Sequence, residues 1–152
     1  MKWRQDDVNK YITAKEYIDT ALLSLLPFHI LKDDEISKQA YQSDVLQIFA
    51  DELERELSGR TMQIPPYTYL HHTDKQQEVS RLNTWIKEIE TQPFKHTFLI
   101  TFDMGWKKYE RQLEGQLIWL PVIQVDHIHD NELKRWMHEN VKQVSELIRS
   151  YW

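Results

Sequence analysis

The chain has 152 residues, with 24 acidic and 19 basic side chains and a formal net charge of −5. It contains no cysteine, which excludes disulfides, thiolate chemistry and cysteine metal sites. No apolar run approaches the ~18 residues of a membrane span, and the two signs of charge are interspersed, which argues against a nucleic-acid partner. The first residues lack the apolar core of a signal peptide. We therefore expect a cytoplasmic, single α/β domain over residues 1–152.

The start of the chain predicts a helix followed by a strand. Residues 4–19 show a partial apolar stripe, with Asp6 or Asp7 available to cap the first turn. Residues 20–28 are apolar on all sides, as expected of a parallel strand that is covered on both faces. One long helix over residues 6–26 is the alternative.

The longest helix is predicted over residues 32–59. Acidic side chains occupy its first turn, where the helix dipole favours negative charge, and Gly59 is suited to a left-handed cap at its end. Its apolar residues recur at three- and four-residue spacing. The side chains expected to face the sheet are Val45, Ile48, Phe49 and Leu53.

The middle of the chain predicts an edge strand and another helix. Residues 62–70 include the Pro65–Pro66 pair, which cannot donate to a strand ladder and therefore suits a short or edge strand. A helix begins after Thr73 or Asp74 and ends before Pro93.

The last part of the chain contains the two most apolar short runs. Strands are predicted at residues 97–102 and 116–123, with a short helix over 105–113 between them and a final helix that begins at Asp130 or Asn131. A hairpin, with 106–113 as a strand, is the alternative. The alternation of strands and helices predicts about four mostly parallel strands with helices on both faces, a three-layer α/β fold.

Several polar residues follow the predicted strands. The carboxyl ends of parallel strands meet at one edge of the sheet, and ligands bind there where the strand order reverses. The candidate catalytic residues at this edge are Asp103, His71 and His127. The candidate ligand-binding residues are His72, Gly105, Trp106, Lys107, Asp126 and His129.

These residue types suit three kinds of chemistry. Burial of Asp103 would raise its pKa and prepare it to share a proton with a histidine. Gly105 and the following helix start could receive an anion, with Lys107 nearby. His127 and His129 could bind a metal ion, although an x-His-x-His loop is also ordinary surface. For Asp103 the simpler interpretation is a helix cap, and no metal or cofactor is predicted.

The N-terminal residues Trp3, Asp7–Val8, Tyr11 and Ala14–Ala21, together with the later Trp119–Leu120–Pro121, resemble the YpiF-like family of small Bacillus-type proteins. The resemblance implies a cytoplasmic bacterial protein. Because the function of that family is unknown, the resemblance supplies no catalytic residue.

Six tryptophans and seven tyrosines raise the question of a partner surface. Aromatic side chains fill cores, but they also anchor interfaces. We expect a non-catalytic protein that binds a partner or forms a homodimer. The alternative is an enzyme that binds a small anionic ligand or a metal ion at the strand carboxyl ends. Shallow strand ends and an apolar surface patch would favour the first.

Overall fold

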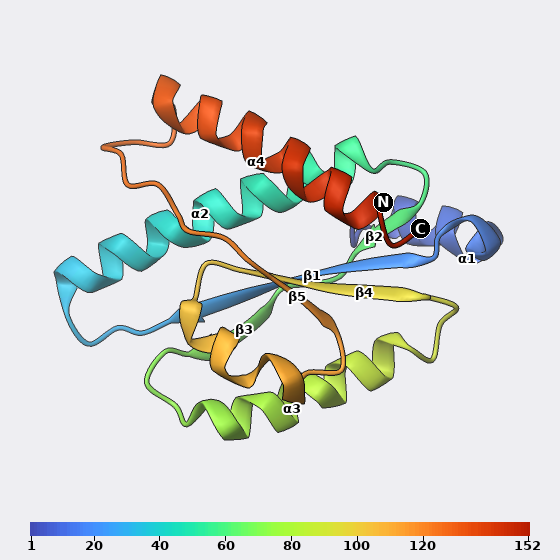
Figure 1. Cartoon of the computed structure of the whole chain (residues 1–152), viewed down its shortest axis with the longest axis horizontal. Coiled ribbons are helices and arrows are strands. Elements are labelled where there is room, and N and C mark those ends of the chain that lie inside the picture. Colours follow the sequence, from blue (N-terminus) through green and yellow to red (C-terminus); the bar gives the residue numbers. More distant parts are fainter.

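The computed structural model describes residues 1–152, and strands alternate with helices along the chain (Figure 1). In order, the elements are α1 (Gln5–Thr13), η1 (Lys15–Tyr17), β1 (Thr20–Phe28), α2 (Asp33–Glu56), β2 (Thr61–Gln63), β3 (Tyr67–Leu70), α3 (Lys75–Ile89), β4 (His96–Thr101), η2 (Met104–Gln112), β5 (Gln116–Trp119) and α4 (Asn131–Arg149). The elements η1 and η2 are 3₁₀ helices.

Strand β1 is the centre of a wholly parallel sheet. On one edge its first residues pair with β2, Thr20 lying opposite Thr61, and its last residues pair with β3, Phe28 lying opposite Leu70. On its other edge it pairs with β4, which in turn pairs with β5. The two runs around β4 and β5 are therefore neighbouring parallel strands, as predicted, and the hairpin alternative is wrong.

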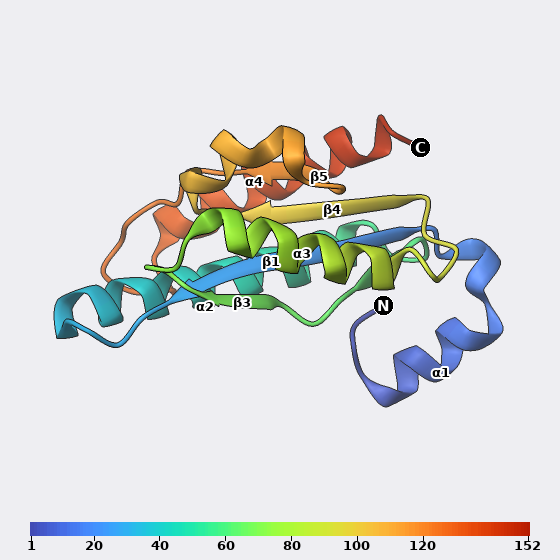
Figure 2. The ribbon, with the colours of Figure 1, turned by 90° about the horizontal axis from the view of Figure 1, so that it is seen from below.

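Helices cover both faces of this sheet and complete three layers. Alternate residues of β1 point to opposite faces. Leu22 packs with α2 and α4, whereas Leu23 packs with α3 and η2. The views in Figures 1 and 2 show α2 and α4 on one side of the strands and α3 on the other. The predicted three-layer α/β class is confirmed. None of the helices combines the length and apolar character needed to cross a membrane.

The start of the chain differs in part from the expectation. Residues 20–28 form a strand, so the long-helix alternative is wrong. The first helix ends at Thr13, because the backbone leaves the helical region at Ala14 (φ −139°, ψ 32°). This bend brings Tyr11 and Ile18 together in a small buried cluster with Met62. Tertiary packing thus overrides the helical pattern of the sequence.

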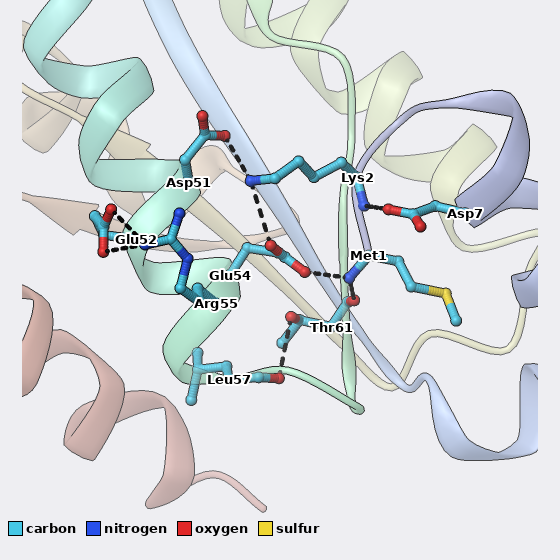
Figure 3. Close-up of polar contacts among 9 residues, drawn as sticks. All are labelled: Met1, Lys2, Asp7, Asp51, Glu52, Glu54, Arg55, Leu57 and Thr61. Carbon is cyan, nitrogen blue, oxygen red and sulfur yellow. Dashed lines mark hydrogen bonds and ion pairs between the residues drawn. The ribbon is translucent and has the colours of Figure 1, made fainter.

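The first residues are also tied to α2 and β2 by polar contacts (Figure 3). The Met1 ammonium group lies 2.5 Å from Glu54 Oε1 and donates to the Thr61 carbonyl at 2.8 Å, and the Lys2 ammonium pairs with Asp51 at 3.0 Å. These contacts fix the segment that leads into α1.

Two strand predictions need correction. The edge strand is interrupted at Pro65–Pro66 and becomes two short strands, β2 and β3. The strand expected over 116–123 ends at Trp119. Leu120 still donates its N–H to the Thr101 carbonyl at 3.0 Å, and no backbone hydrogen bond from residues 121–123 continues the ladder.

Helix α2 faces the sheet as predicted, apart from one residue. Val45, Phe49 and Leu53 are fully buried. Ile48 is 36% exposed and lines a cavity between α2 and α4, so its predicted place against the sheet is wrong. Leu46 is buried in the same core cluster as Phe49. Gly59 adopts a positive φ of 92° just beyond the helix, as the sequence indicates.

The contrast between Phe49 and Ile48 gives a test of this core. Phe49→Ala should lower the free energy of unfolding by ~3–5 kcal/mol, because it opens a cavity between α2 and the sheet. Ile48→Ala should cost less than about 1 kcal/mol, because that side chain is partly solvated. Denaturant unfolding of both variants checks this. Equal costs would contradict the observed orientation of α2.

Candidate functional site at the strand carboxyl ends

The strand order reverses at β1. From β1 the chain passes to β2 and β3 on one edge and later returns to β4 on the other edge. The carboxyl ends of β1 and β4 therefore flank the position at which doubly wound sheets bind ligands. Asp103 follows β4 at this position, and His29 follows β1.

The Asp103 carboxylate is held by three donors from three parts of the chain. Its Oδ2 accepts the Tyr69 hydroxyl at 2.6 Å and lies 2.5 Å from the Lys75 ammonium. Its Oδ1 accepts the N–H of Gly105 at 2.9 Å, which caps η2. The predicted capping role of Asp103 is confirmed, but the carboxylate is also one partner of an ion pair.

Aromatic rings enclose this ion pair. The Trp106 indole N–H donates to the Tyr69 oxygen at 2.8 Å, and both side chains are almost completely buried. The Lys75 nitrogen lies 5.0 Å from the centre of the Tyr69 ring and 4.9 Å from that of Trp106. Cation–π attraction therefore adds to the ion pair.

The side chains of Asp103 and Lys75 lie close to the Cα of Gly105. A Cβ at this position would lie 3.0 Å from Asp103 Oδ1 and 3.3 Å from the Lys75 nitrogen. Its N–H is already bonded to Asp103, so the start of η2 does not offer that donor to an anion.

The ionisation of the network follows from these contacts. Burial raises the pKa of Asp103, but the hydrogen bonds from Lys75 and Tyr69 outweigh it and hold the pKa below its ordinary value. The sequence-based expectation of a raised pKa is wrong in direction, because the sequence does not place Lys75. Burial, together with the charge of Asp103, raises the pKa of Tyr69. An ionised carboxylate that is already paired is a poor general base at neutral pH.

The histidines that follow β3 lie close to His29. The ring centres of His29 and His71 are 6.1 Å apart, and those of His29 and His72 are 5.1 Å apart. Burial lowers the pKa of His71, while the charge of Asp103 acts on it in the opposite direction. None of the hydrogen bonds of Asp103 is to a histidine.

The other predicted site residues lie apart from this group. Asp126, His127 and His129 are exposed in the loop between β5 and α4, where the His129 N–H donates to His127 Nδ1 at 3.2 Å. His129 lines the cavity between α2 and α4. The Lys107 ammonium lies 4.8 Å from the Trp119 ring centre. The structure thus brings Asp103, Gly105 and Trp106 together, and His71 with His72. The roles proposed for these residues in binding or catalysis stay predictions.

Sequence reasoning missed the residues that complete the two groups. Tyr69 lies two residues after Tyr67 in an edge strand, and Lys75 is the first residue of α3 after the Asp74 cap. Both are ordinary residues at such positions, so neither is recognised as a site residue from the sequence. From the sequence, Glu35 is expected only to interact with the helix dipole, because it is an acidic residue in the first turn of α2. Its Oε2 in fact lies 3.3 Å from His29 Nε2. These contacts follow from the tertiary arrangement of β1, β3, β4, α2 and α3.

The space at the strand ends is small. The cavity lined by Pro27, Phe102 and Asp103 has a volume of ≈20 Å³. Ligand pockets commonly measure about 300–1,000 Å³. At the position where a doubly wound sheet usually opens, the Asp103 carboxylate is therefore occupied by Lys75 and Tyr69, and the cavity beside it is small.

These features define a doubly wound α/β protein whose strand carboxyl ends are closed by a polar network. The chain belongs to the family described as protein of unknown function DUF2487, whose sequence model matches residues 9–152. It is 28% identical over 152 residues to "Uncharacterized protein YpiF" of Bacillus subtilis (strain 168), covering 100% of this chain and 98% of that protein. The resemblance to a YpiF-like family is thereby confirmed. No solved structure matches the chain.

The Asp103–Lys75 pair can be tested by separating charge from shape. Asp103→Asn keeps the capping ability, because Asn caps about as well as Asp, but it leaves the Lys75 charge without a partner. We expect a loss of ~3–5 kcal/mol in unfolding free energy at neutral pH. The double variant Asp103→Asn/Lys75→Met should recover part of this loss.

The pH dependence of the same variant supplies a second readout. The folded-state pKa of Asp103 is lowered from 3.8, so its contribution is present above that value and is lost as pH falls through the folded pKa. The difference in unfolding free energy between the wild type and Asp103→Asn should be constant near neutral pH, and it should decrease below about pH 3.8. A difference that is absent at pH 7, or that increases in acid, would contradict this description of the pair.

Proposed function

We propose that this chain is a non-catalytic protein that self-associates through the groove between α1 and α3. The observation that carries the proposal is an apolar groove of ≈820 Å³, lined by Trp3, Ile12 and Trp85 among others. Trp3 is 59% exposed and Ile12 is 58% exposed. Large apolar side chains gathered around a concave surface are typical of an interface.

Contacts of Tyr11 hold the base of the groove together. The Tyr11 ring stacks on Phe94 at 5.6 Å, and its hydroxyl donates to Gln92 Oε1 at 3.0 Å. These contacts hold α1 against the segment that joins α3 to β4. Figure 2 shows α1 beyond the end of the sheet, where it is covered less than the other helices. A partner can therefore approach α1 without rearranging the core.

The charges at the groove favour a second copy of the same chain as the occupant. Lys15 and Glu88 both line the groove, and neither forms an ion pair within the chain. We propose that Lys15 of each copy faces Glu88 of the other, and a twofold axis would then form this pair twice, because contacts in such an interface are reciprocal. The apolar rim would be buried in the same step.

The enzymatic alternative is supported less well. The position of the Asp103 network and of the neighbouring histidines favours a small anionic ligand or a metal-dependent reaction there. However, the ≈20 Å³ cavity leaves no room for a substrate, and the carboxylate is already neutralised by Lys75. The cavity of ≈780 Å³ beside His129 is lined by side chains of both charges. The cytoplasmic location that the sequence predicts stays a prediction.

Self-association is tested by sedimentation equilibrium or light scattering coupled to size exclusion. The wild type should be a dimer, and Ile12→Glu should be a monomer that keeps its circular dichroism spectrum, because the side chain is exposed in each copy. Leu31→Glu is the matched control, since Leu31 is 73% exposed at the opposite end of the sheet. A monomeric wild type, or dissociation by Leu31→Glu alone, would refute the proposed interface.

Charge reversal tests the reciprocal contact. Lys15→Glu and Glu88→Lys should each weaken the dimer, because they place like charges opposite each other. The double variant restores both pairs and should therefore dimerise again. If each single change has no effect, or if the double variant is weaker than both, Lys15 does not face Glu88. Binding of an apolar small molecule by a chain that remains monomeric would assign the groove to a ligand instead.

A further inference from the structure

A histidine cluster lies at the carboxyl edge of β1 and β3, and it arises from their register. Phe28 lies opposite Leu70, and the His71 N–H donates to the Phe28 carbonyl at 2.9 Å. The next residue of each strand is a histidine, so His29 and His71 leave the sheet in step. His72 follows directly, and its ring lies 5.3 Å from that of His71.

Glu35 adds a carboxylate to this cluster from the first turn of α2. Its Oε2 lies 3.3 Å from Nε2 of His29. Ligand atoms of His29, Glu35 and His72 all lie within 4.8 Å of one another. In a tetrahedral zinc site, with metal–ligand bonds of 2.0–2.1 Å, neighbouring ligand atoms are about 3.4 Å apart. The His29–Glu35 distance already meets this value, and a small movement of His72 would complete the set.

We propose that His29, Glu35 and His72 bind a divalent transition-metal ion such as Zn²⁺. Two imidazoles and one carboxylate match the nitrogen and oxygen donors that this class of ion takes, and three protein ligands leave a coordination position for water or for another donor. The neighbouring His71 is near enough in the cluster to serve as that fourth donor.

The burial of the three ligands suits such a site. His29 is only 6% exposed and Glu35 is half-buried, so two ligands are held in place before an ion arrives. His72 is exposed, so its ring is free to close on the ion. The site would join the loop after β1 to the loop after β3. This role is independent of the α1–α3 groove, which lies at the other end of the strands.

The protons can be followed through the binding step. His29 Nδ1 accepts the Leu31 N–H at 3.3 Å, so the proton of the neutral ring is on Nε2 and faces Glu35. When the ion bonds to Nε2, this proton transfers to Nδ1 through solvent and the Leu31 contact is lost. That contact is long, and Leu31 is exposed, so its N–H can bond to water instead. The ring remains neutral and no net charge is transferred.

The competing interpretation is a simple polar contact between the neutral His29 ring and Glu35 beside an exposed histidine, which predicts no affinity for metal. Isothermal titration of the full chain with Zn²⁺ distinguishes the two. We expect one equivalent to bind, and Co²⁺ should give the visible absorption of a site of low coordination number. Loss of a residue that only hydrogen-bonds to a metal ligand already costs 10–100-fold in metal affinity, so His72→Gln and Glu35→Gln should each weaken binding by at least about tenfold.

The control variant is His129→Gln, which removes the other histidine pair of the chain, His127 with His129. It should leave the affinity unchanged. His72 and His129 are both exposed, so neither substitution should unfold the chain. Circular dichroism of both variants checks that the fold is kept. Absence of Zn²⁺ binding by the wild type overturns the proposal, as does a loss of binding in His129→Gln while His72→Gln binds normally. If two equivalents bind and His72→Gln loses one, the proposed site is supported.

Discussion

The structure depends on the pairing of β1 along both of its edges. Because β1 is apolar on both faces, it must lie between two helical layers. Because it is central in the sheet, its register positions all the other strands, either directly or through β4. Pairing with β4 places Asp103 beside the end of β1. Pairing with β3 places His71 and His72 beside His29. The two polar groups at the carboxyl edge are therefore consequences of one pair of ladders.

The Asp103–Lys75 pair gives this fold an unusual closed end. In a doubly wound sheet the loops at the switch point usually leave a crevice for a ligand. Here the carboxylate accepts from the ammonium group and the Tyr69 hydroxyl, and the Trp106 indole N–H donates to the Tyr69 oxygen. Removal of either charge would leave the other buried without a partner. The large apolar groove lies at the other end of the strands, and for this reason our proposal places binding there.

Most of the fold can be predicted from the sequence, because the spacing of apolar residues and the capping residues indicate the same elements. The continuous apolar run of β1, the helical spacing in α2 and the Asp74 and Asp130 caps each indicate the element that forms. The errors occur at element boundaries, as at Ala14, where the first helix ends early, and at Trp119, where the last strand ends. The capping role of Asp103 is predictable from its local position. Its ion pair is not, because Lys75 is 28 residues away and has no distinguishing motif. The sequence places His127 and His129 beside Asp103 only if the last strand reaches residue 123, and that strand ends at Trp119.

Hydrogen exchange at several protein concentrations is the most direct test of where this protein makes its contacts. If self-association uses the groove, the amides of α1 and of the last turn of α3 should become more protected as concentration rises. Those of residues 29–32 and 71–74, at the opposite end of the strands, should exchange at a constant rate. Protection that rises at residues 29–32 and 71–74 instead, or that is independent of concentration throughout, would contradict the account.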